Sequence, residues 1–247
     1  MPKQEELSGI YKWAGAEDPW ALVHSALEAG ATRIHLSGAP GVGKSYAGLF
    51  STPKEGQEVF QVSLSEDISV QELMGHFVPK NGLFEWHDGP CCQAARKGAV
   101  LVINELGRAS DSVKDFLLGL LDDPKVARIS LPTGETLAPT KGFKVVATSN
   151  SPVSELDPAL QDRFEVIIHL DRPNPELIKK LNSALEGLGD AIRDSYKTPG
   201  MEIPPRRAMA FLALVKKGVE AKQAAAMTFG AGAMDFVTAL KSRKIAV

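Results

Sequence analysis

Gly38-Ala39-Pro40-Gly41-Val42-Gly43-Lys44-Ser45 is the stretch of sequence that decides the fold. It matches the pattern G-x-x-x-x-G-K-[ST] at every specified position. Glycines in such a loop let backbone N–H groups wrap around a phosphate, because they carry no Cβ atom that would obstruct it. Lys44 then reaches the β- and γ-phosphates of ATP, and the hydroxyl of Ser45 is a ligand for Mg²⁺. The motif predicts that this whole loop binds ATP together with Mg²⁺.

The segments on either side of the loop support this prediction. A short strand, residues 32–38, precedes the loop, and a helical pattern runs from Lys44 to about Phe50. The amino end of that helix directs a partial positive charge toward the phosphates. Strand, loop and helix therefore follow one another in the order that phosphate binding requires.

Strands and helices alternate up to about residue 170. Predicted helices cover residues 18–30, 66–75, 89–98 and 111–122, and predicted strands cover 57–65, 99–104, 143–150 and 164–170. Asn81-Gly82 and Thr133-Gly134 mark two β-hairpins. In the first hairpin Phe84 and Trp86 share one strand face, and we expect both to pack. The alternation predicts βαβ units and a parallel sheet that helices cover on both faces.

The chain changes character at DRPNPE, residues 171–176. Beyond it we find only helical patterns, at 176–188, 205–218 and 219–241, the last with a break near Gly230 and Gly232. We therefore expect an α/β fold of two domains. A P-loop NTPase core with a parallel sheet would cover residues 1–170, and a small C-terminal helical lid would cover residues 171–247.

Composition restricts the classes of function. The 247 residues carry a formal net charge of −2, which gives no overall basic field for nucleic acid. No apolar run approaches the roughly 18 residues that span a bilayer, and the polar segment 1–13 does not resemble a signal peptide. Cys91 and Cys92 are adjacent, and we expect one to be packed in a helix and the other not. These features predict a cytoplasmic protein that does not insert into membranes.

The second acidic element departs from the usual pattern. A buried strand in a P-loop NTPase leads to an aspartate that holds Mg²⁺, whereas here AVLVI leads to Asn104 and Glu105. Glu105 is placed to polarise the water that attacks the γ-phosphate. Asn104 occupies the metal-holding position without a charge, although its amide oxygen can accept a hydrogen bond from a metal-bound water. We therefore expect weakened metal handling and slow hydrolysis.

Taken in order, these segments resemble the AAA+ superfamily, in particular its MoxR and dynein/midasin-related branch. GLFEWHDGPCCQAARKGAVLVINELGRAS resembles that branch's hairpin, turn, helix and acidic strand end, with Asn104 where the family has aspartate. ARISLPTGETL resembles the pre-sensor hairpin, and VVATSNSP resembles the strand that ends in a polar sensor, Asn150. LDPALQDRFEVIIHLDRP resembles the segment that carries the arginine finger, Arg163. PPRRAMAFL resembles the start of the sensor-2 helix, where Arg206 and Arg207 are both candidates for the phosphate-facing arginine.

The resemblance, which covers about residues 20–215, implies an ATPase that works as a homo-oligomeric, hexameric ring. ATP would lie between subunits. Glu105 would orient water, Asn150 would sense the γ-phosphate, and Arg163 of the next subunit would stabilise charge in the transition state. Hydrolysis would remodel or activate a protein client in the manner of MoxR-like chaperones, whose partners often carry a von Willebrand A-like domain.

Two other classes of function compete with this interpretation. One is a nucleotide-gated assembly module with weak or no hydrolysis, for which Asn104 is the sequence support. The other is a DNA-associated ATPase, against which the acidic balance argues. A small-molecule kinase would leave the sensor and finger segments unexplained.

Overall fold

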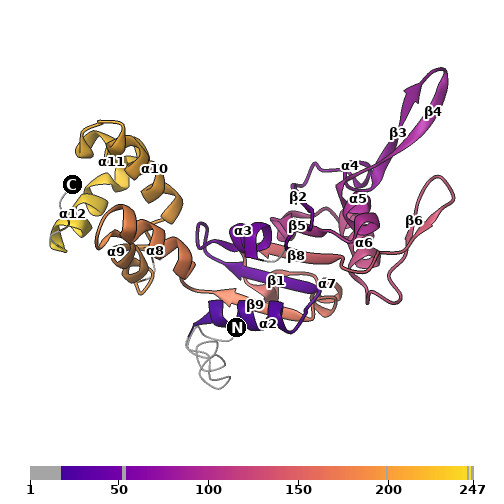
Figure 1. Cartoon of the computed structure of the whole chain (residues 1–247), viewed down its shortest axis with the longest axis horizontal. Helices are drawn as coiled ribbons and strands as arrows, with labels where there is room; N and C mark the ends of the chain where they lie inside the picture. Colours follow the sequence, from indigo (N-terminus) through magenta and orange to yellow (C-terminus); the bar gives the residue numbers. More distant parts are fainter. Residues whose placement is uncertain (1–17, 52–53, 199, 244, 246–247) are drawn as a thin grey trace. The chain divides into compact units, whose positions relative to one another are not determined.

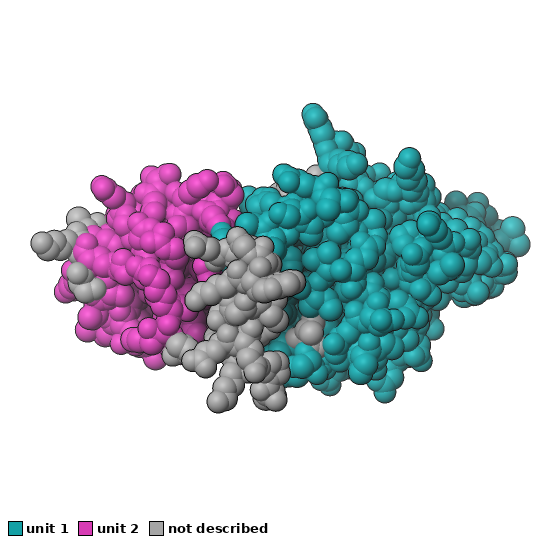
Figure 2. Space-filling model, turned by 90° about the horizontal axis from the view of Figure 1, so that it is seen from below, with its two compact units in different colours: residues 1–38, 44–169 teal, residues 39–43, 170–247 magenta. Residues whose placement is uncertain are grey.

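The computed structural model describes residues 18–51, 54–198, 200–243 and 245. These residues form two compact units, which Figure 2 colours separately. The first unit contains the described residues up to Gly38 and Lys44–His169, and the second contains Ala39–Gly43 and the described residues from Leu170 onward. Segment 1–13, which we expect not to be a signal peptide, lies outside the described residues.

A five-stranded parallel sheet organises the first unit (Figure 1). Its order is β2-β5-β8-β1-β9, and its strands are β1 (Arg33–Gly38), β2 (Val59–Ser63), β5 (Val100–Asn104), β8 (Lys144–Ser149) and β9 (Val166–Leu170). In the register, Ile103 lies opposite Ala147, and Ser149 lies opposite Ser37. The carboxyl ends of β5, β8 and β1 therefore meet at one edge of the sheet, and the predicted α/β fold is confirmed.

Helices cover both faces of this sheet. On one face, α5 (Pro90–Lys97) and α6 (Asp111–Leu121) share a core with Leu101 and Ala147. On the other face, α3 (Lys44–Tyr46) continues into a π-helical turn, Ala47–Ser51. There a Cβ added at Gly48 would lie 3.0 Å from the side chain of Val102. The predicted helix after the loop is thus present, but its last turn is widened into a π-turn where it packs most closely on the sheet.

Local sequence signals fix the other short elements of the first unit. They are α2 (Pro19–Glu28), α4 (Val70–Met74), α7 (Pro158–Asp162) and the 3₁₀ turns Leu106–Arg108 and Val153–Glu155. The Asp18 side chain accepts a hydrogen bond from the backbone N–H of Trp20, 3.1 Å long, and so caps α2. Gly98 ends α5 in a left-handed conformation, with φ of 61°.

The first hairpin, β3 (Gly75–Lys80) and β4 (Leu83–Asp88), projects away from the sheet (Figure 1). Asn81 and Gly82 both have positive φ, as a two-residue hairpin turn requires. Trp86 packs edge-on against Phe77, with ring centroids 5.2 Å apart. Phe84 is 73% exposed because it lies near the tip, beyond the reach of the core. The expectation that both aromatic side chains pack is therefore wrong for Phe84.

The second hairpin consists of β6 (Ile129–Ser130) and β7 (Thr136–Leu137), and it is much shorter. The turn between them includes Gly134, whose φ is 86°. Ile129 and Leu137 lie opposite each other and are both buried in the core of the first unit.

Apart from Leu170, the last residue of β9, helices form the second unit's secondary structure in the described residues. They are α8 (Pro175–Ala184), α9 (Leu188–Ser195), α10 (Pro205–Lys216), α11 (Ala221–Phe229) and α12 (Ala233–Ser242), with a 3₁₀ turn at Gly230–Gly232. The prediction of one helix over 176–188 is wrong. Leu185 is extended and Gly187 is left-handed, with φ of 80°, so the chain breaks before α9 begins. The unit has its own core, in which Phe211, Phe229 and Phe236 pack together.

Cys91 and Cys92 are both fully buried, so the prediction that only one of them packs is wrong. α5 contacts β2 and β5 on one side and α4 on the other, which leaves neither cysteine facing solvent. Burial raises the pKa of both thiols, and they are therefore held in the unreactive protonated form. Among the described residues, no helix has both the length and the apolar composition needed to cross a membrane.

Candidate active site

The candidate site lies at the edge of the sheet where β5, β8 and β1 end. Asn104 is the last residue of β5 and Glu105 follows it, while Asn150 follows β8. Lys44 begins α3, just after the glycine-rich loop that leaves β1. Parallel sheets bind ligands outside the carboxyl ends of their strands, and these four side chains, far apart in sequence, come together there.

Lys44 is a buried cation at the centre of this group. Its Nζ donates hydrogen bonds to the carbonyl oxygen of Gly38, at 2.7 Å, and to Oδ1 of Asn150, at 3.0 Å. Burial lowers the pKa of Lys44 to about 8, and the nearby negative charge of Glu105 acts in the opposite direction. An anion beside Nζ would favour the charged form further, so the surroundings of Lys44 suit a phosphate.

Ser45 and Asn104 form the second contact of the site. The hydroxyl of Ser45 donates to Oδ1 of Asn104 over 2.6 Å, and the hydroxyl of Thr148 donates to the same oxygen over 3.2 Å. On the other side, Nδ2 of Asn104 lies 3.4 Å from the carbonyl oxygen of Val62. These partners fix the amide orientation, so that the oxygen of Asn104 points toward Ser45.

Glu105 occupies a strained backbone position. Its φ of 59° and ψ of 42° are left-handed, which is uncommon for a residue other than glycine. Its carboxylate accepts two contacts from Nδ2 of Asn150, at 2.9 and 3.1 Å. The amide of Asn150 therefore joins two groups, with its oxygen on Lys44 and its nitrogen on Glu105. Strained residues of this kind cluster at functional sites.

The middle of the glycine-rich loop, Ala39–Gly43, groups with the second unit. The backbone N–H of Asn174 donates to the carbonyl oxygen of Val42 over 2.8 Å. A Cβ added at Gly41 would lie 3.5 Å from both Pro204 and Pro205, and φ of 87° at Gly41 favours glycine there in any case. Pro40 is exposed within the loop.

Arg206 and Arg207 lie in the first turn of α10, directly after Pro205, and both are exposed. Gly41 therefore lies close to the segment that carries both arginines. Arg207 also lines a pocket of about 620 Å³ in the second unit. The structure thus leaves both arginines as candidates for the sensor-2 role.

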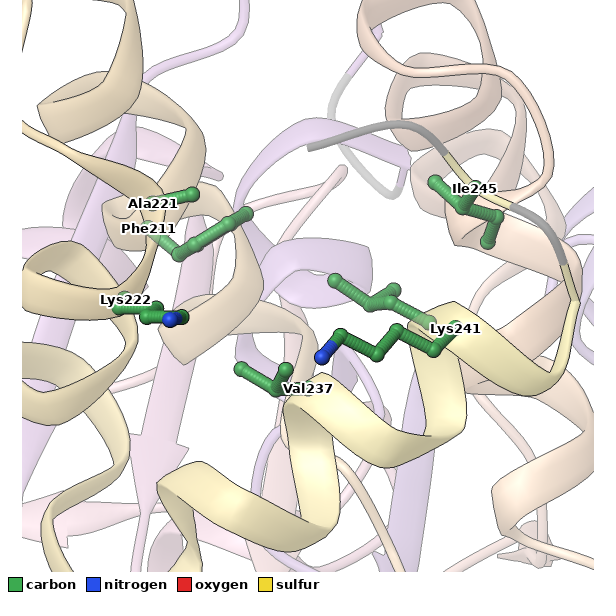
Figure 3. A pocket seen from close by; sticks show the side chains of 7 residues that line it. Phe211, Ala221, Lys222, Val237, Lys241 and Ile245 are labelled. Atoms are coloured by element: carbon green, nitrogen blue, oxygen red, sulfur yellow. The ribbon is translucent and has the colours of Figure 1, made fainter.

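A smaller pocket of about 90 Å³ lies elsewhere in the second unit (Figure 3). Its walls are mainly apolar and include Phe211, Val237 and Ile245, with Lys222 and Lys241 beside them. It contains none of the predicted site residues, and we assign it no role in binding nucleotide.

Arg163 lies at the opposite end of the sheet from Lys44. It caps the C-terminus of α7, and the carboxylate of Glu165, two residues later, accepts from the backbone N–H of Thr32 just before β1. Lys44 follows the other end of β1. The six residues of this strand, at 3.3 Å per residue, therefore separate Lys44 from Arg163 by about 20 Å. Nε of Arg163 lies 3.6 Å from Asp122, and 30% of the side chain is exposed. Arg163 therefore does not reach Lys44 of its own chain.

The residues present fit ATP and Mg²⁺. Ser45 and Asn104 place two neutral oxygens 2.6 Å apart, and oxygen is the ligand that Mg²⁺ prefers, with phosphates and water completing its shell. Ser45 would bind the ion directly and Asn104 would hold a metal-bound water. Lys44 and the loop N–H groups would hold the phosphates.

Comparison with known protein families shows which family this chain belongs to. Residues 33–164, more than half of the chain, match the family described as the AAA domain (dynein-related subfamily). The chain belongs to this family. The matched region includes Lys44, Ser45, Asn104, Glu105, Asn150 and Arg163, whereas Arg206 and Arg207 lie beyond it.

Curated relatives of this AAA domain agree with the family. The chain is 31% identical to Protein NorQ of Paracoccus denitrificans over 62% of this chain and 57% of that protein. It is 26% identical to Protein CbbQ of Hydrogenophilus thermoluteolus over 63% of this chain and 59% of that protein. It is 32% identical to Midasin of Dictyostelium discoideum over 47% of this chain and 2% of that protein. The chain thus matches less than two thirds of the length of each relative.

Solved structures show the same fold. NtrX from Brucella abortus, determined in complex with ATP, superposes on 82% of this chain with a TM-score of 0.53 and 12% identity, covering 52% of that chain. A mutant of RuvB from Thermotoga maritima superposes on 92% with a TM-score of 0.50 and 15% identity, covering 69% of that chain. At such identities the likeness concerns the fold alone.

The structure also adds residues that sequence reasoning missed in this AAA domain. Thr148 holds Asn104, and Ser149 holds the segment around Asn150 through a hydrogen bond to Ser151. His35 contacts Ser149 from the neighbouring strand. One signal was available, because a histidine stands between two apolar residues, Ile34 and Leu36, in the middle of a strand.

Proposed function

We propose that this AAA domain binds ATP with Mg²⁺ and hydrolyses it at the subunit interfaces of a homo-oligomeric ring, and that hydrolysis remodels or activates a protein client. The observation that carries the proposal is the amide of Asn150, which joins Lys44 to Glu105. This links a phosphate-binding cation, a polar sensor and a carboxylate in one hydrogen-bonded group, as γ-phosphate hydrolysis requires.

The chain's own residues divide the chemistry. Lys44 and the loop from Gly38 to Gly43 hold the phosphates, and Ser45 with Asn104 orients the metal side. When bound, Mg²⁺ would neutralise negative charge that develops on the phosphate oxygens. Glu105 accepts a hydrogen bond from the attacking water, whose oxygen forms a bond to the γ-phosphorus as the bond to the bridging oxygen breaks. Asn150 holds the side chains of Glu105 and Lys44 in a fixed relation through its two amide hydrogen bonds.

The position of Arg163 supports a ring. The length of β1 puts Arg163 about 20 Å from Lys44 of its own chain, so Arg163 would serve a neighbour's nucleotide. An arginine finger supplied in this way contributes roughly 10³–10⁵ in rate. A ring of six copies is the assembly that the resemblance to MoxR proteins suggests, and the same resemblance suggests a client with a von Willebrand A-like domain.

A second function is favoured by one specific observation. Asn104 holds its place through neutral hydrogen bonds to Ser45 and Thr148 and brings no negative charge to the metal. A nucleotide-gated assembly module would bind ATP and form the ring with little turnover. Nothing in the site similarly favours action on DNA.

Steady-state ATP hydrolysis with Mg²⁺ tests the proposal. We expect wild-type turnover, loss of ATP binding in Lys44→Ala, and loss of turnover with retained binding in Glu105→Gln. Gln keeps the shape of Glu105 but cannot accept the proton of the attacking water. Wild-type binding without measurable turnover would instead support the assembly module, and unchanged ATP affinity in Lys44→Ala would contradict both functions.

A further inference from the structure

A series of hydrogen bonds, which begins at the buried side chain of His35, leads to the residues on either side of Asn150. His35 occupies the middle of β1, between the core residues Ile34 and Leu36, and is itself fully buried. Its Nε2 lies 3.1 Å from Oγ of Ser149, the last residue of the neighbouring strand β8. Its ring also contacts Phe164, with ring centroids 5.4 Å apart.

The direction of the hydrogen bonds follows from counting protons. The hydroxyl of Ser149 donates its one proton to the carbonyl oxygen of Ser151, over 2.9 Å. Ser149 must then accept from His35, so Nε2 of the imidazole carries the proton. Burial, and next the charge of Lys44, lower the pKa of His35 to about 4. The imidazole ring is therefore neutral, and the series of hydrogen bonds runs from His35 through Ser149 to Ser151.

These hydrogen bonds fix the backbone on both sides of Asn150. Ser149 and Ser151 flank Asn150 directly, and the hydroxyl of Ser149 bridges across it. Asn150 itself is exposed, so packing does not determine where its side chain points. The backbone direction set by the bridge is what allows the amide to meet both Lys44 and Glu105.

Packing alone does not account for a histidine here. Among the described residues, Nδ1 of His35 is buried without a hydrogen-bond partner. A buried polar atom left unpaired is destabilising, whereas an apolar side chain of similar size would fill the same space without that penalty. The hydrogen bond to Ser149 compensates for that penalty.

We propose that His35 is a positioning residue of the ATP-hydrolysing site, acting through Ser149 to hold Asn150 between Lys44 and Glu105. This inference rests on the proposed function of that site. It assigns His35 no contact with nucleotide, and its effect is expected in turnover and in recognition of the γ-phosphate rather than in binding of ADP.

Three substitutions of His35 separate the hydrogen bond from packing. The amide nitrogen of glutamine is as many bonds from Cα as Nε2 of histidine, so His35→Gln can still donate to Ser149. The amide of asparagine reaches only as far as Nδ1, so His35→Asn cannot. His35→Leu fills the space without a donor. Gln and Asn carry the same amide into the core, and each is therefore the control for the other.

For the full chain we would measure kcat and KM for ATP, and the affinities for ADP and ATPγS by calorimetry. We expect kcat to fall about tenfold in His35→Leu and His35→Asn and to stay within about twofold of wild type in His35→Gln, which is the range of one hydrogen bond. ADP affinity should be unchanged in all three. Ser149→Ala should match His35→Leu, and combining the two should have no further effect.

The outcomes distinguish this inference from the proposed function. Equal kcat in His35→Gln and His35→Asn, or wild-type kcat in His35→Leu alongside a loss in Asn150→Ala, would overturn the positioning role and leave the ATPase intact. Absence of wild-type turnover would count against the proposed function instead. The ratio of ATPγS to ADP affinity would then be the readout, and an equal ratio in wild type and His35→Asn would overturn the inference. Should His35→Leu not fold, the Gln and Asn pair still decides.

Discussion

In the proposed function, replacing Asn104 with aspartate would supply the negative charge that Asn104 lacks beside the bound metal. Oδ1 of Asn104 accepts the Ser45 hydroxyl over 2.6 Å, so an aspartate oxygen there keeps the same donor. The other amide atom changes character. Nδ2 lies 3.4 Å from the carbonyl oxygen of Val62, and an oxygen in that place faces the carbonyl without a proton between them.

The structure sets the size of the effect. A Mg²⁺ ion bound to Ser45 at about 2.1 Å would lie within about 4.7 Å of the aspartate oxygen, given the 2.6 Å contact. At an effective dielectric of 20, one negative charge and a divalent ion at that distance attract by about 7 kcal/mol before hydration is considered. Desolvation offsets most of this. We expect a net gain of about 1.4 kcal/mol, which corresponds to a tenfold lower Mg²⁺ requirement. Without Mg²⁺, the buried carboxylate should destabilise the fold by about 1–2 kcal/mol.

The assay is a Mg²⁺ titration of ATP turnover at saturating ATP, with urea unfolding in the presence and absence of Mg²⁺. Asn81→Asp is the control, because it adds the same charge at an exposed hairpin turn that aspartate tolerates. Asn104→Ala should shift the Mg²⁺ requirement in the opposite direction. If Asn104→Asp leaves the rate, the Mg²⁺ requirement and the stability as in wild type, Asn104 does not face the metal.

Three further predictions follow from particular contacts. Between pH 6.5 and 4 the unfolded chain should bind a proton at His35 that the folded chain does not, because burial lowers the pKa of His35 to about 4. The free energy of unfolding should therefore decrease by up to about 3 kcal/mol as the pH is lowered from 6.5 to 4. Urea unfolding of His35→Gln should lack this pH-dependent decrease. Gly48→Ala should destabilise the fold by about 1–3 kcal/mol, because the new methyl would lie 3.0 Å from Val102. Gly119→Ala in α6 is the control: its methyl would lie 3.4 Å from the Arg128 carbonyl, and the change should be neutral or stabilising by up to about 1 kcal/mol. Equal thermal midpoints for the two variants would refute this prediction. Phe84→Ser should leave the thermal midpoint within about 1–2 °C of wild type, since the side chain is 73% exposed, and a larger fall would show that Phe84 packs after all.

Sequence patterns predicted the sheet and the loop because both depend on local signals. The run AVLVI predicted β5, and the glycines with Lys44 and Ser45 predicted a loop between a strand and a helix, which lies between β1 and α3. Asn81-Gly82 likewise predicted a two-residue hairpin turn, which the positive φ of both residues confirms. In each case a short segment carries both the pattern and its physical cause.

Features that depend on contacts between distant segments were not predictable in this way. The break before α9 depends on how Leu185 and Gly187 adapt to the second unit's core, since the apolar pattern continues through them. The grouping of Ala39–Gly43 with the second unit depends on contacts with Asn174 and Pro204. The bond from His35 to Ser149 requires the register of β1 against β8, which no local pattern specifies.

Mixing two inactive variants tests most directly the claim that a complete hydrolytic site is shared between copies of this chain. Lys44→Ala protein keeps Arg163 but cannot hold ATP, and Arg163→Ala protein binds ATP but offers no finger to its neighbour. Some interfaces of a mixed assembly pair an intact loop from the second variant with an intact Arg163 from the first. We predict that each variant alone is inactive and that the mixture regains ATP turnover. A mixture that stays inactive while the two variants demonstrably assemble together would contradict the account, as would wild-type specific activity that does not change on dilution to monomer.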